Sequence, residues 1–268
     1  MSGSLRTRGL HVELGGRTVL GSVDLDIADG ATTAVIGPNG SGKSTLLRCL
    51  ARLQRHDGSV TLDGEEVGRM RPRAFARRVA LLPQSPVAPE NLTVTDLVSR
   101  GRDPHRRWYD QWSVADEREV AEAIRRTGLE PLADRALDTL SGGQRQRAWI
   151  ALALAQSAEV LLLDEPTTYL DVAHQLEVLE TVADIQRERG ITVVMVLHDL
   201  ALAAAHADRI VAVHEGRVAA AGPAAEVVDP ALLRDVFDIE ASLLTDPRTG
   251  RPVVVPHRAL HTPEDGHE

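Results

Sequence analysis

The sequence predicts an α/β fold built around a parallel sheet. Two observations predict it: continuous apolar runs at Val160–Leu163 and Val193–Leu197 are typical of parallel strands covered on both faces, and a helical pattern over Ala173–Arg189 joins them in a β-α-β crossover. The 268 residues, of which 43% are hydrophobic and 26% charged, are enough for one large domain or two small ones. We therefore expect a folded α/β core rather than a disordered chain.

The other elements follow in order along the chain. Thr32–Ile36 is a short apolar strand, and a glycine-rich turn after it leads into a helix over about Lys43–Leu53. Residues from about 87 to 155 change to a helical pattern, clearest at Asp116–Thr127 and Gln144–Ala155, which predicts a helical lobe inserted in the core. The remaining β-rich or apolar segments predict short strands beside turns: Leu10–Leu14, Arg17–Ile27, Gly58–Leu62, Val79–Leu82, Arg209–His214 and Gly216–Ala220.

Charge and cysteine content exclude several classes of protein. The formal net charge of −9 argues against nucleic acid as a partner, because phosphate binding needs a surplus of Lys and Arg. The single cysteine, Cys49, rules out a disulfide framework and a multi-cysteine zinc site, and we expect it to pack as a small apolar side chain. The opening MSGSLRTRGL has no apolar core, and no apolar run approaches the roughly 20 residues that span a bilayer. These features predict a soluble protein of the cytosol.

Lys43 is the only lysine among the 30 basic side chains, the rest being arginine. It lies in a GxxxxGK[ST] string between a predicted strand and a predicted helix, the context in which such a loop cradles phosphates rather than forming a plain turn. Lys43 is expected on the β- and γ-phosphates, and the Ser44 hydroxyl on Mg²⁺. A planar guanidinium does not fit the same cradle, which explains the lone lysine. The predicted phosphate loop comprises Gly37, Pro38, Asn39, Gly40, Ser41, Gly42, Lys43, Ser44 and Thr45.

Two carboxylates, Asp164 and Glu165, follow the apolar strand Val160–Leu163. Ligands of open parallel sheets lie at the carboxyl ends of the strands, so we expect both residues beside the phosphate loop. Asp164 is expected to hold Mg²⁺ through water, and Glu165 to polarise an attacking water. A strand ended by two solvated acids is the simpler reading, but the neighbouring phosphate loop argues against it. Together the two motifs predict a nucleoside triphosphatase without saying which kind.

A second helix start, in the string LSGGQRQR, also carries the features of an anion site. Ser141 is a good N-cap, and Gln144 three residues later completes a capping box. Gly142 and Gly143 let a phosphate approach this helix N-terminus. A merely well-capped helix is the alternative, and a second anion site in one chain calls for a reason.

The string resembles the LSGGQ signature of ATP-binding cassette (ABC) ATPases, and other motifs of that family follow the same order. Gln84 resembles the glutamine of the Q-loop, Asp171 the aspartate of the D-loop, and His198 the switch histidine. The resemblance covers about residues 5–240. It implies a P-loop NTPase (RecA-like) core with a small antiparallel β subdomain and the inserted helical lobe, followed by a C-terminal extension over 241–268 whose tail from about Thr262 is frayed.

The resemblance also implies roles for these residues. Two copies form a head-to-tail dimer, in which each ATP lies between the phosphate loop of one copy and Ser141–Gln144 of the other, so the second anion site serves the partner's γ-phosphate. Glu165 is then the general base, and His198 contacts the γ-phosphate and positions the water. Gln84 links Mg²⁺ and the water to the helical lobe. ATP and Mg²⁺ are the expected ligands.

Within the family, the chain resembles a bare cassette that works with a separate permease. Gly101–His105 (GRDPH) and Thr167–Gln175 (TTYLDVAHQ) resemble importer ATPases for iron–siderophores, haem and cobalamin, although relatives often carry an aromatic near Asp103. The resemblance implies a peripheral protein on the cytoplasmic face of the membrane, bound to a polytopic permease and indirectly to a substrate-binding protein. Iron–siderophore import is the first expectation, and haem, cobalamin or another chelate the second. A soluble ABC ATPase without a permease, such as an iron–sulfur assembly component, is the alternative from another class.

Three smaller features complete the predictions. ABC cassettes usually stack an aromatic on adenine where this chain has Leu14, and Arg17 is a possible substitute because guanidinium planes also stack on bases. Arg100–Trp112 interleaves arginines with three of the seven aromatics, and we interpret it as a surface for the permease or, alternatively, a packed corner of the lobe. The C-terminal histidines show no metal-ligand spacing: His257, His261 and His267.

Overall fold

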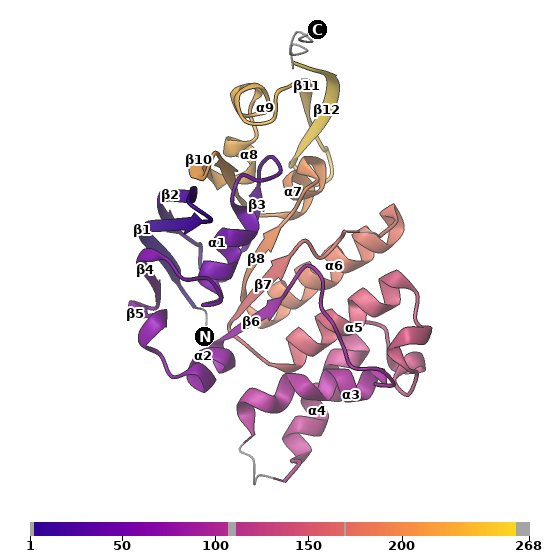
Figure 1. Ribbon diagram of the computed structural model, residues 1–268. Coiled ribbons are helices and arrows are strands. Elements are labelled where there is room, and N and C mark those ends of the chain that lie inside the picture. The colour runs from indigo at the N-terminus through magenta and orange to yellow at the C-terminus, as the bar shows by residue number, and fades with distance from the viewer. Residues whose placement is uncertain (1–2, 107–110, 169, 261–268) are drawn as a thin grey trace, which may run out of the picture.

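A computed structural model describes residues 3–106, 111–168 and 170–260. Its central sheet has the strand order β10-β9-β3-β8-β7-β6. The strands run parallel except β10, which pairs antiparallel with β9 through a turn at Glu215-Gly216. The predicted α/β class is therefore confirmed (Figure 1). The strands are β3 (Thr32–Ile36), β6 (Val79–Leu82), β7 (Val160–Asp164), β8 (Thr192–Val196), β9 (Arg209–His214) and β10 (Arg217–Pro223).

Every residue of β3, β7 and β8 is buried, because helices cover both faces of the central sheet. Side chains alternate between two apolar clusters, as strand geometry requires. Val35, Leu162 and Val194 share one cluster with α1 (Lys43–Leu50), in which Cys49 is fully buried as expected. Their neighbours along the strands share the other cluster with three helices, α5 (Gly142–Ala155), α6 (Val172–Arg189) and α7 (Leu200–His206).

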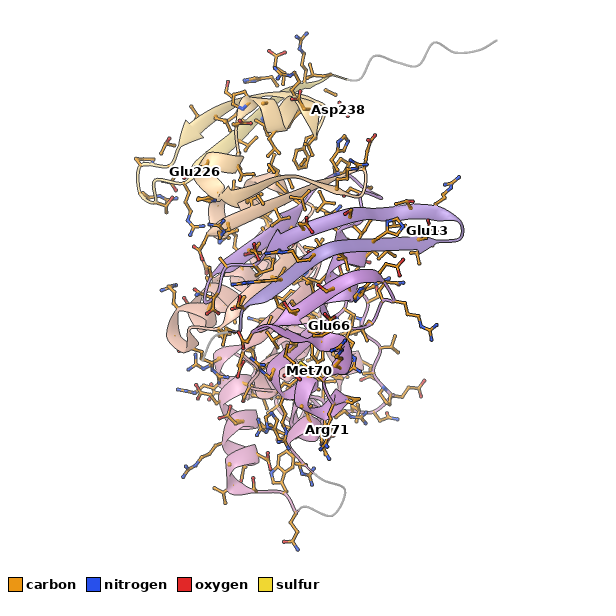
Figure 2. All side chains as sticks on the ribbon, turned by 90° about the vertical axis from the view of Figure 1, so that its left-hand side faces the viewer. Glu13, Glu66, Met70, Arg71, Glu226 and Asp238 are labelled. Carbon is orange, nitrogen blue, oxygen red and sulfur yellow. The ribbon has the colours of Figure 1, made fainter. Side chains whose placement is uncertain are left out.

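A second, antiparallel sheet covers α1 on the side away from the central sheet (Figures 1 and 2). Its strand order is β2-β1-β4-β5. Figure 2 shows β1 and β2 as a long hairpin with Glu13 near its tip. This sheet corresponds to the small antiparallel β subdomain of the sequence prediction. Its strands are β1 (Leu5–Leu14), β2 (Arg17–Asp26), β4 (Asp57–Leu62) and β5 (Glu65–Glu66), and a short turn, η1 (Val67–Arg69), and helix α2 (Pro72–Arg78) lead from it back to β6.

A buried ion pair joins Arg102 of the GRDPH string to another helix of the lobe. Arg102 is 7% exposed and donates from Nε to Asp116 Oδ1 at 2.9 Å and from Nη1 to the carbonyl of Ala155 at 2.8 Å. An ideal Cβ on Gly101 would lie 2.3 Å from the carbonyl oxygen of Leu152, so only glycine fits there. The string thus joins α4 (Val114–Arg126) and the C-terminal end of α5 within the lobe. The lobe comprises α3 (Val94–Ser99), η2 (Arg100–His105), α4, η3 (Glu130–Leu132), η4 (Leu137–Thr139) and α5.

The C-terminal part contains a β-hairpin that the sequence analysis did not predict. After α8 (Ala224–Val227) and α9 (Pro230–Asp235), β11 (Ile239–Thr245) pairs antiparallel with β12 (Pro252–Ala259). The expected boundary at residue 240 falls inside β11, and buried Val254 joins the hairpin to the same core as α7 and α9. His257 contacts Ser242, whereas His261, His267 and the tail from Thr262 lie outside the described residues. Among the residues described, no helix is both long and apolar enough to cross a bilayer.

Candidate nucleotide site

The phosphate loop joins β3 to α1 in a conformation that only glycine allows at two positions. Gly37 has φ +147°, and a Cβ there would lie 2.0 Å from the carbonyl oxygen of Val213 on β9. Gly42, the N-cap of α1, has φ +105°, and its Cβ would lie 2.9 Å from the carbonyl oxygen of Val19 on β2. The loop is therefore wedged between the two sheets, with the α1 N-terminus pointing into it.

Lys43 is 5% exposed, and its ammonium is folded back onto the loop. Nζ donates to the carbonyl oxygens of Gly37 at 2.9 Å and Pro38 at 2.8 Å. Burial lowers the pKa of Lys43, and the negative charges of Glu165 and Asp164 partly offset this effect. The ammonium therefore lies inside the loop, and its expected contact with the β- and γ-phosphates stays a prediction.

Ser44 and Asp164 place two oxygen donors together at the junction of α1 and β7. Ser44 Oγ donates to Asp164 Oδ1 at 2.8 Å. Asp164 is 2% exposed, and burial raises its pKa against the opposing effects of the Ser44 bond and the positive charge of Arg48. Hard oxygen ligands suit Mg²⁺. A further polar atom in the loop, Ser41 Oγ, is buried and has no hydrogen-bond partner among the described residues. These donors fit a magnesium–triphosphate group.

Glu165 is held at the end of β7 by side chains from three directions. Its backbone has φ +53°, a left-handed conformation that is costly for a non-glycine residue. Oε2 accepts hydrogen bonds from Gln84 Nε2 at 2.5 Å and Thr168 Oγ1 at 3.1 Å, and Oε1 lies 2.5 Å from His198 Nε2. The structure therefore brings Gln84 and His198 to the predicted base. Thr168 was missed, because no spacing along the chain signals a contact across its turn.

Glu165, His198 and several phosphate-loop residues line one pocket of about 360 Å³, and Asp164 and Gln84 adjoin it through their bonds to Ser44 and Glu165. Leu14 and Arg17 are not among its lining residues: they face each other at the tip of the β1–β2 hairpin, and Leu14 is 45% exposed. Val19 of β2, which the sequence analysis did not select, lines the pocket instead. The roles of Leu14 and Arg17 stay predictions. The lining comprises Val19, Asn39, Gly40, Gly42, Lys43, Ser44, Thr45, Glu165 and His198.

The signature residues lie apart from this pocket. Ser141 caps α5: its Oγ accepts from Gln144 N at 3.3 Å, and its own N–H donates to Gln144 Oε1 at 3.1 Å. The predicted capping box is confirmed. Asp171 caps α6, and neither it nor Ser141–Gln144 lines the pocket. One chain therefore brings together the phosphate loop, Asp164, Glu165, Gln84 and His198, but not the signature.

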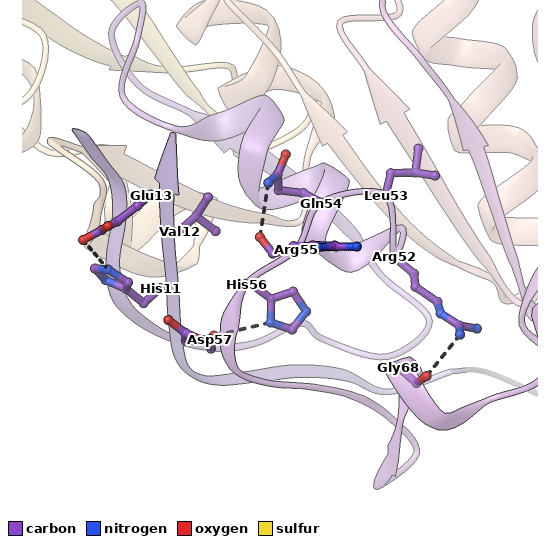
Figure 3. A pocket seen from close by; sticks show the side chains of 10 residues that line it. All are labelled: His11, Val12, Glu13, Arg52, Leu53, Gln54, Arg55, His56, Asp57 and Gly68. Carbon is purple, nitrogen blue, oxygen red and sulfur yellow. Dashed lines mark hydrogen bonds and ion pairs between the residues drawn. The ribbon is translucent and has the colours of Figure 1, made fainter. Parts of the chain in front are cut away.

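A larger depression of about 890 Å³ lies below α1, between β1 and β4 (Figure 3). Several of its polar side chains contact one another or nearby carbonyl groups: His11 contacts Glu13 at 3.5 Å, Arg52 donates to the carbonyl of Gly68 at 3.1 Å, and His56 contacts the carbonyl of Asp57 at 3.3 Å. No predicted site residue lines it. It is therefore not the candidate site.

Part of the segment Arg100–Trp112 can be described. Arg106 lies over the Trp112 ring, with its guanidinium carbon 5.0 Å from the ring centroid. Trp112 also lines a mainly apolar depression of about 560 Å³ on the lobe, together with Val120 and Ile124. Arg107, Trp108 and Tyr109 fall outside the described residues.

Comparison with known proteins agrees with this site. The family model "ABC transporter" matches residues 20–168, more than half of the chain. The achromobactin transport ATP-binding protein CbrD of Dickeya dadantii is 47% identical over 254 residues, 94% of each chain, and the hemin import ATP-binding protein HmuV of Streptomyces coelicolor is 45% identical over 94% of this chain and 89% of that protein. A solved dimeric bacterial ABC transporter cassette superposes with a TM-score of 0.72 at 26% identity, covering 82% of this chain and 98% of the other. The chain therefore belongs to the ABC transporter family, as one of its ATPases.

Proposed function

We propose that this ATPase powers the import of a metal chelate, first of all an iron–siderophore, through a separate membrane permease. The observation that carries the proposal is the position of Glu165, held by Gln84 and His198 beside the phosphate loop. The similarity over nearly the whole chain to an achromobactin transport and a hemin import ATP-binding protein supports the class of cargo, and the hemin importer supports the direction of transport.

Residues in and beside the pocket divide the work of ATP hydrolysis in this proposal. Lys43 leaves the loop carbonyls and binds the β- and γ-phosphates, while the loop amides and the α1 N-terminus bind the remaining oxygens. Ser44, Gln84 and Asp164, the last through water, hold Mg²⁺, which when bound neutralises charge developing on the phosphates. Glu165 accepts the proton of the attacking water. His198 holds Glu165 in place and donates toward the γ-phosphate.

A second copy of the chain completes the site in this proposal. Ser141–Gln144 and Asp171 cap helices that do not reach the chain's own pocket, so they are free to serve another nucleotide. Gly142 supports this role because nothing lies within 4 Å of a Cβ built on it. A head-to-tail pair would place this open helix N-terminus over the partner's γ-phosphate, and the resemblance to a dimeric cassette supports that arrangement.

The helical lobe supplies the surface for the permease. Trp112 and the apolar depression beside it offer an anchor of the type that dominates interface energetics, and Arg106 lies over the same ring. The protein would thus sit on the cytoplasmic face of the membrane. Replacing Arg106 and Trp108 by Ala is expected to abolish transport while the subunit folds and binds ATP. Unchanged uptake would instead favour a packed corner of the lobe.

The identity of the chelate is tested by transport. The relatives for achromobactin and hemin are 47% and 45% identical, too close for sequence to separate the two cargoes. Cells lacking the protein, complemented with wild type or Glu165→Gln, should be compared for uptake of ferric siderophore, hemin and cobalamin. Loss of ferric-siderophore uptake alone supports the proposal. Normal uptake of all three, with no permease co-purifying from membranes, would favour a soluble ABC ATPase.

A further inference from the structure

The two signature glycines have different surroundings. Gly142 faces open space, whereas an ideal Cβ on Gly143 would lie 2.5 Å from Cδ2 and 2.9 Å from Cγ of His174. Gly143 has no positive φ that would demand glycine. The imidazole of His174 is therefore what excludes a side chain at position 143. Because Gly143 lies in the first turn of α5, this contact places the start of the signature helix directly against the His174 ring.

His174 is itself fixed by the D-loop aspartate. Asp171 Oδ1 accepts a hydrogen bond from the backbone N–H of His174 at 2.9 Å and contacts its ring Nδ1 at 2.7 Å. A carboxylate accepts only, so we assign the ring proton to Nδ1. These bonds hold the pKa of Asp171 below its usual value. The ring is thus oriented at one edge by Asp171 and packs with the other against Gly143.

A second contact joins α5 and α6 one turn further along both helices. Arg147 of α5 pairs with Glu177 of α6 through Nη1 at 3.1 Å. Both side chains stand one helical turn beyond the Gly143–His174 contact. The first two turns of α5 and α6 are therefore joined at two successive levels.

We propose that His174 is a positioning residue for ATP hydrolysis, whose ring seats the signature loop against the Asp171 loop so that both reach the partner's nucleotide as one unit. This inference rests on the proposed head-to-tail dimer. Without the ring, only the Arg147–Glu177 pair of these two contacts would remain, one turn away from Ser141–Gly143 and Asp171, and their relative position would be less closely fixed. Since a misplacement of about 1 Å can lower a rate by about 100-fold, seating of this kind can decide the turnover number.

The test is a double-mutant cycle on the full-length chain. Gly143→Ala is expected to lower kcat by about 10- to 100-fold, because its methyl group displaces the His174 ring. In a His174→Ala background the methyl has room, so Gly143→Ala should lower kcat further by less than about threefold. An equal fold-loss in both backgrounds would mean that the methyl clashes with the partner's nucleotide instead, and would overturn the proposal.

Two further variants separate the contribution of the ring's bond to Asp171 from that of its packing against Gly143. His174→Asn keeps an amide donor for Asp171 but loses the atoms against Gly143, whereas His174→Phe keeps the packing and loses the donor. Seating through the ring predicts that His174→Phe retains more turnover than His174→Asn. Equal wild-type turnover in both would overturn the proposal. Glu180→Ala, exposed on the same helix, is the matched control.

A binding measurement distinguishes failure of the His174 inference from failure of the proposed function. All His174 variants should bind nucleotide to the isolated subunit as wild type does, because the ring is not part of the pocket lining. In a Glu165→Gln background, ATP should drive dimerisation of the parent chain but only weakly that of the His174→Ala form. Equal dimerisation of both would overturn the inference alone. A wild-type chain that neither hydrolyses ATP nor dimerises would overturn the proposed function.

Discussion

His198 Nε2 lies 2.5 Å from Glu165 Oε1, joining the ends of two neighbouring parallel strands at the nucleotide pocket. Glu165 is 7% exposed, whereas the imidazole is 45% exposed and faces the pocket. One side of the carboxylate is thus held by the protein while the histidine remains accessible to a ligand. In the proposed mechanism, His198 would contact the γ-phosphate while it holds Glu165 in place.

The first prediction concerns the base itself. Glu165→Gln keeps the shape of the side chain and its contact with His198 but cannot take a proton. We expect ATP to bind as before, hydrolysis to slow by about 10²- to 10⁴-fold, and a closed dimer to accumulate. Steady-state hydrolysis and size-exclusion chromatography with ATP measure both effects. Hydrolysis at the wild-type rate by the assembled transporter would refute the role, and Glu180→Gln is the matched control.

Lys43→Arg tests whether the phosphate loop requires a lysine at the one position where this chain does not use arginine as its Lys/Arg residue. The guanidinium is larger than the space in which Nζ lies 2.8 Å and 2.9 Å from two loop carbonyls. Loss of one charged hydrogen bond, about 1.5–3 kcal/mol, corresponds to about 10- to 150-fold weaker ATP binding. Equilibrium binding of ATP measures it. The reciprocal exchange at an exposed position of the same helix, Arg48→Lys, should leave affinity unchanged; a similar loss there would contradict the explanation.

Sequence patterns predicted the core because local and tertiary preferences agree there. The bounds of β3 and β6 match the predicted strands, since buried parallel strands form short, nearly continuous apolar or β-branched runs. The helix expected to end near Leu53 ends at Leu50, because Arg52 turns back with φ +60°. The β11–β12 hairpin was missed because its outer face carries aliphatic side chains such as Leu244, so no clear alternation marks it.

In the candidate site, too, some residues could be predicted from the sequence and others could not. Lys43 could be selected because its motif lies in one loop between adjacent elements, and Asp164 because it ends an apolar strand. Val19 and His174 could not, because their contacts join segments far apart in the chain: Val19 with the phosphate loop, and His174 with Gly143. Such contacts leave no spacing pattern along the chain.

Asp164→Asn is expected to stabilise the nucleotide-free protein while impairing Mg²⁺-dependent hydrolysis. Burial raises the pKa of Asp164 in the folded state, so ionisation at neutral pH costs folding free energy, and an amide that still accepts from Ser44 removes that cost. The penalty is absent where the carboxyl is protonated in both states and grows as pH rises through its folded pKa. The difference in melting temperature should therefore be positive at pH 7 and shrink on acidification. A variant less stable than wild type at pH 7 would contradict this account.

Arg102→Met tests whether the GRDPH string is structural. It removes the buried guanidinium and leaves Asp116, which is 5% exposed, without its counter-charge. Breaking a buried pair in this way costs about 3–5 kcal/mol of the free energy of unfolding. Urea denaturation measures the loss, and Arg100→Met, two residues earlier and exposed, is the control. If both variants unfold at the same urea concentration, the buried pair does not hold the lobe together.

The last prediction concerns the adenine face. The sequence resemblance aligns Leu14 with the position where ABC cassettes usually stack an aromatic, and Arg17 pairs with it at the tip of the hairpin, although neither lines the pocket. An aliphatic side chain lacks aromatic stacking, worth about 0.5–1.5 kcal/mol, so ATP should bind about 2- to 12-fold more weakly than with Tyr there, with poor discrimination between ATP and GTP. If Leu14→Tyr tightens ATP binding to the isolated subunit and Arg17→Ala changes nothing, Leu14 leaves the adenine face of the site underfilled. If Leu14→Tyr has no effect and Arg17→Ala weakens binding, Arg17 holds the base and the interpretation of Leu14 is wrong. Val19, which lines the pocket, provides the reference: Val19→Ala should weaken ATP and GTP binding alike, because its contact with the nucleotide would be apolar and indifferent to the base.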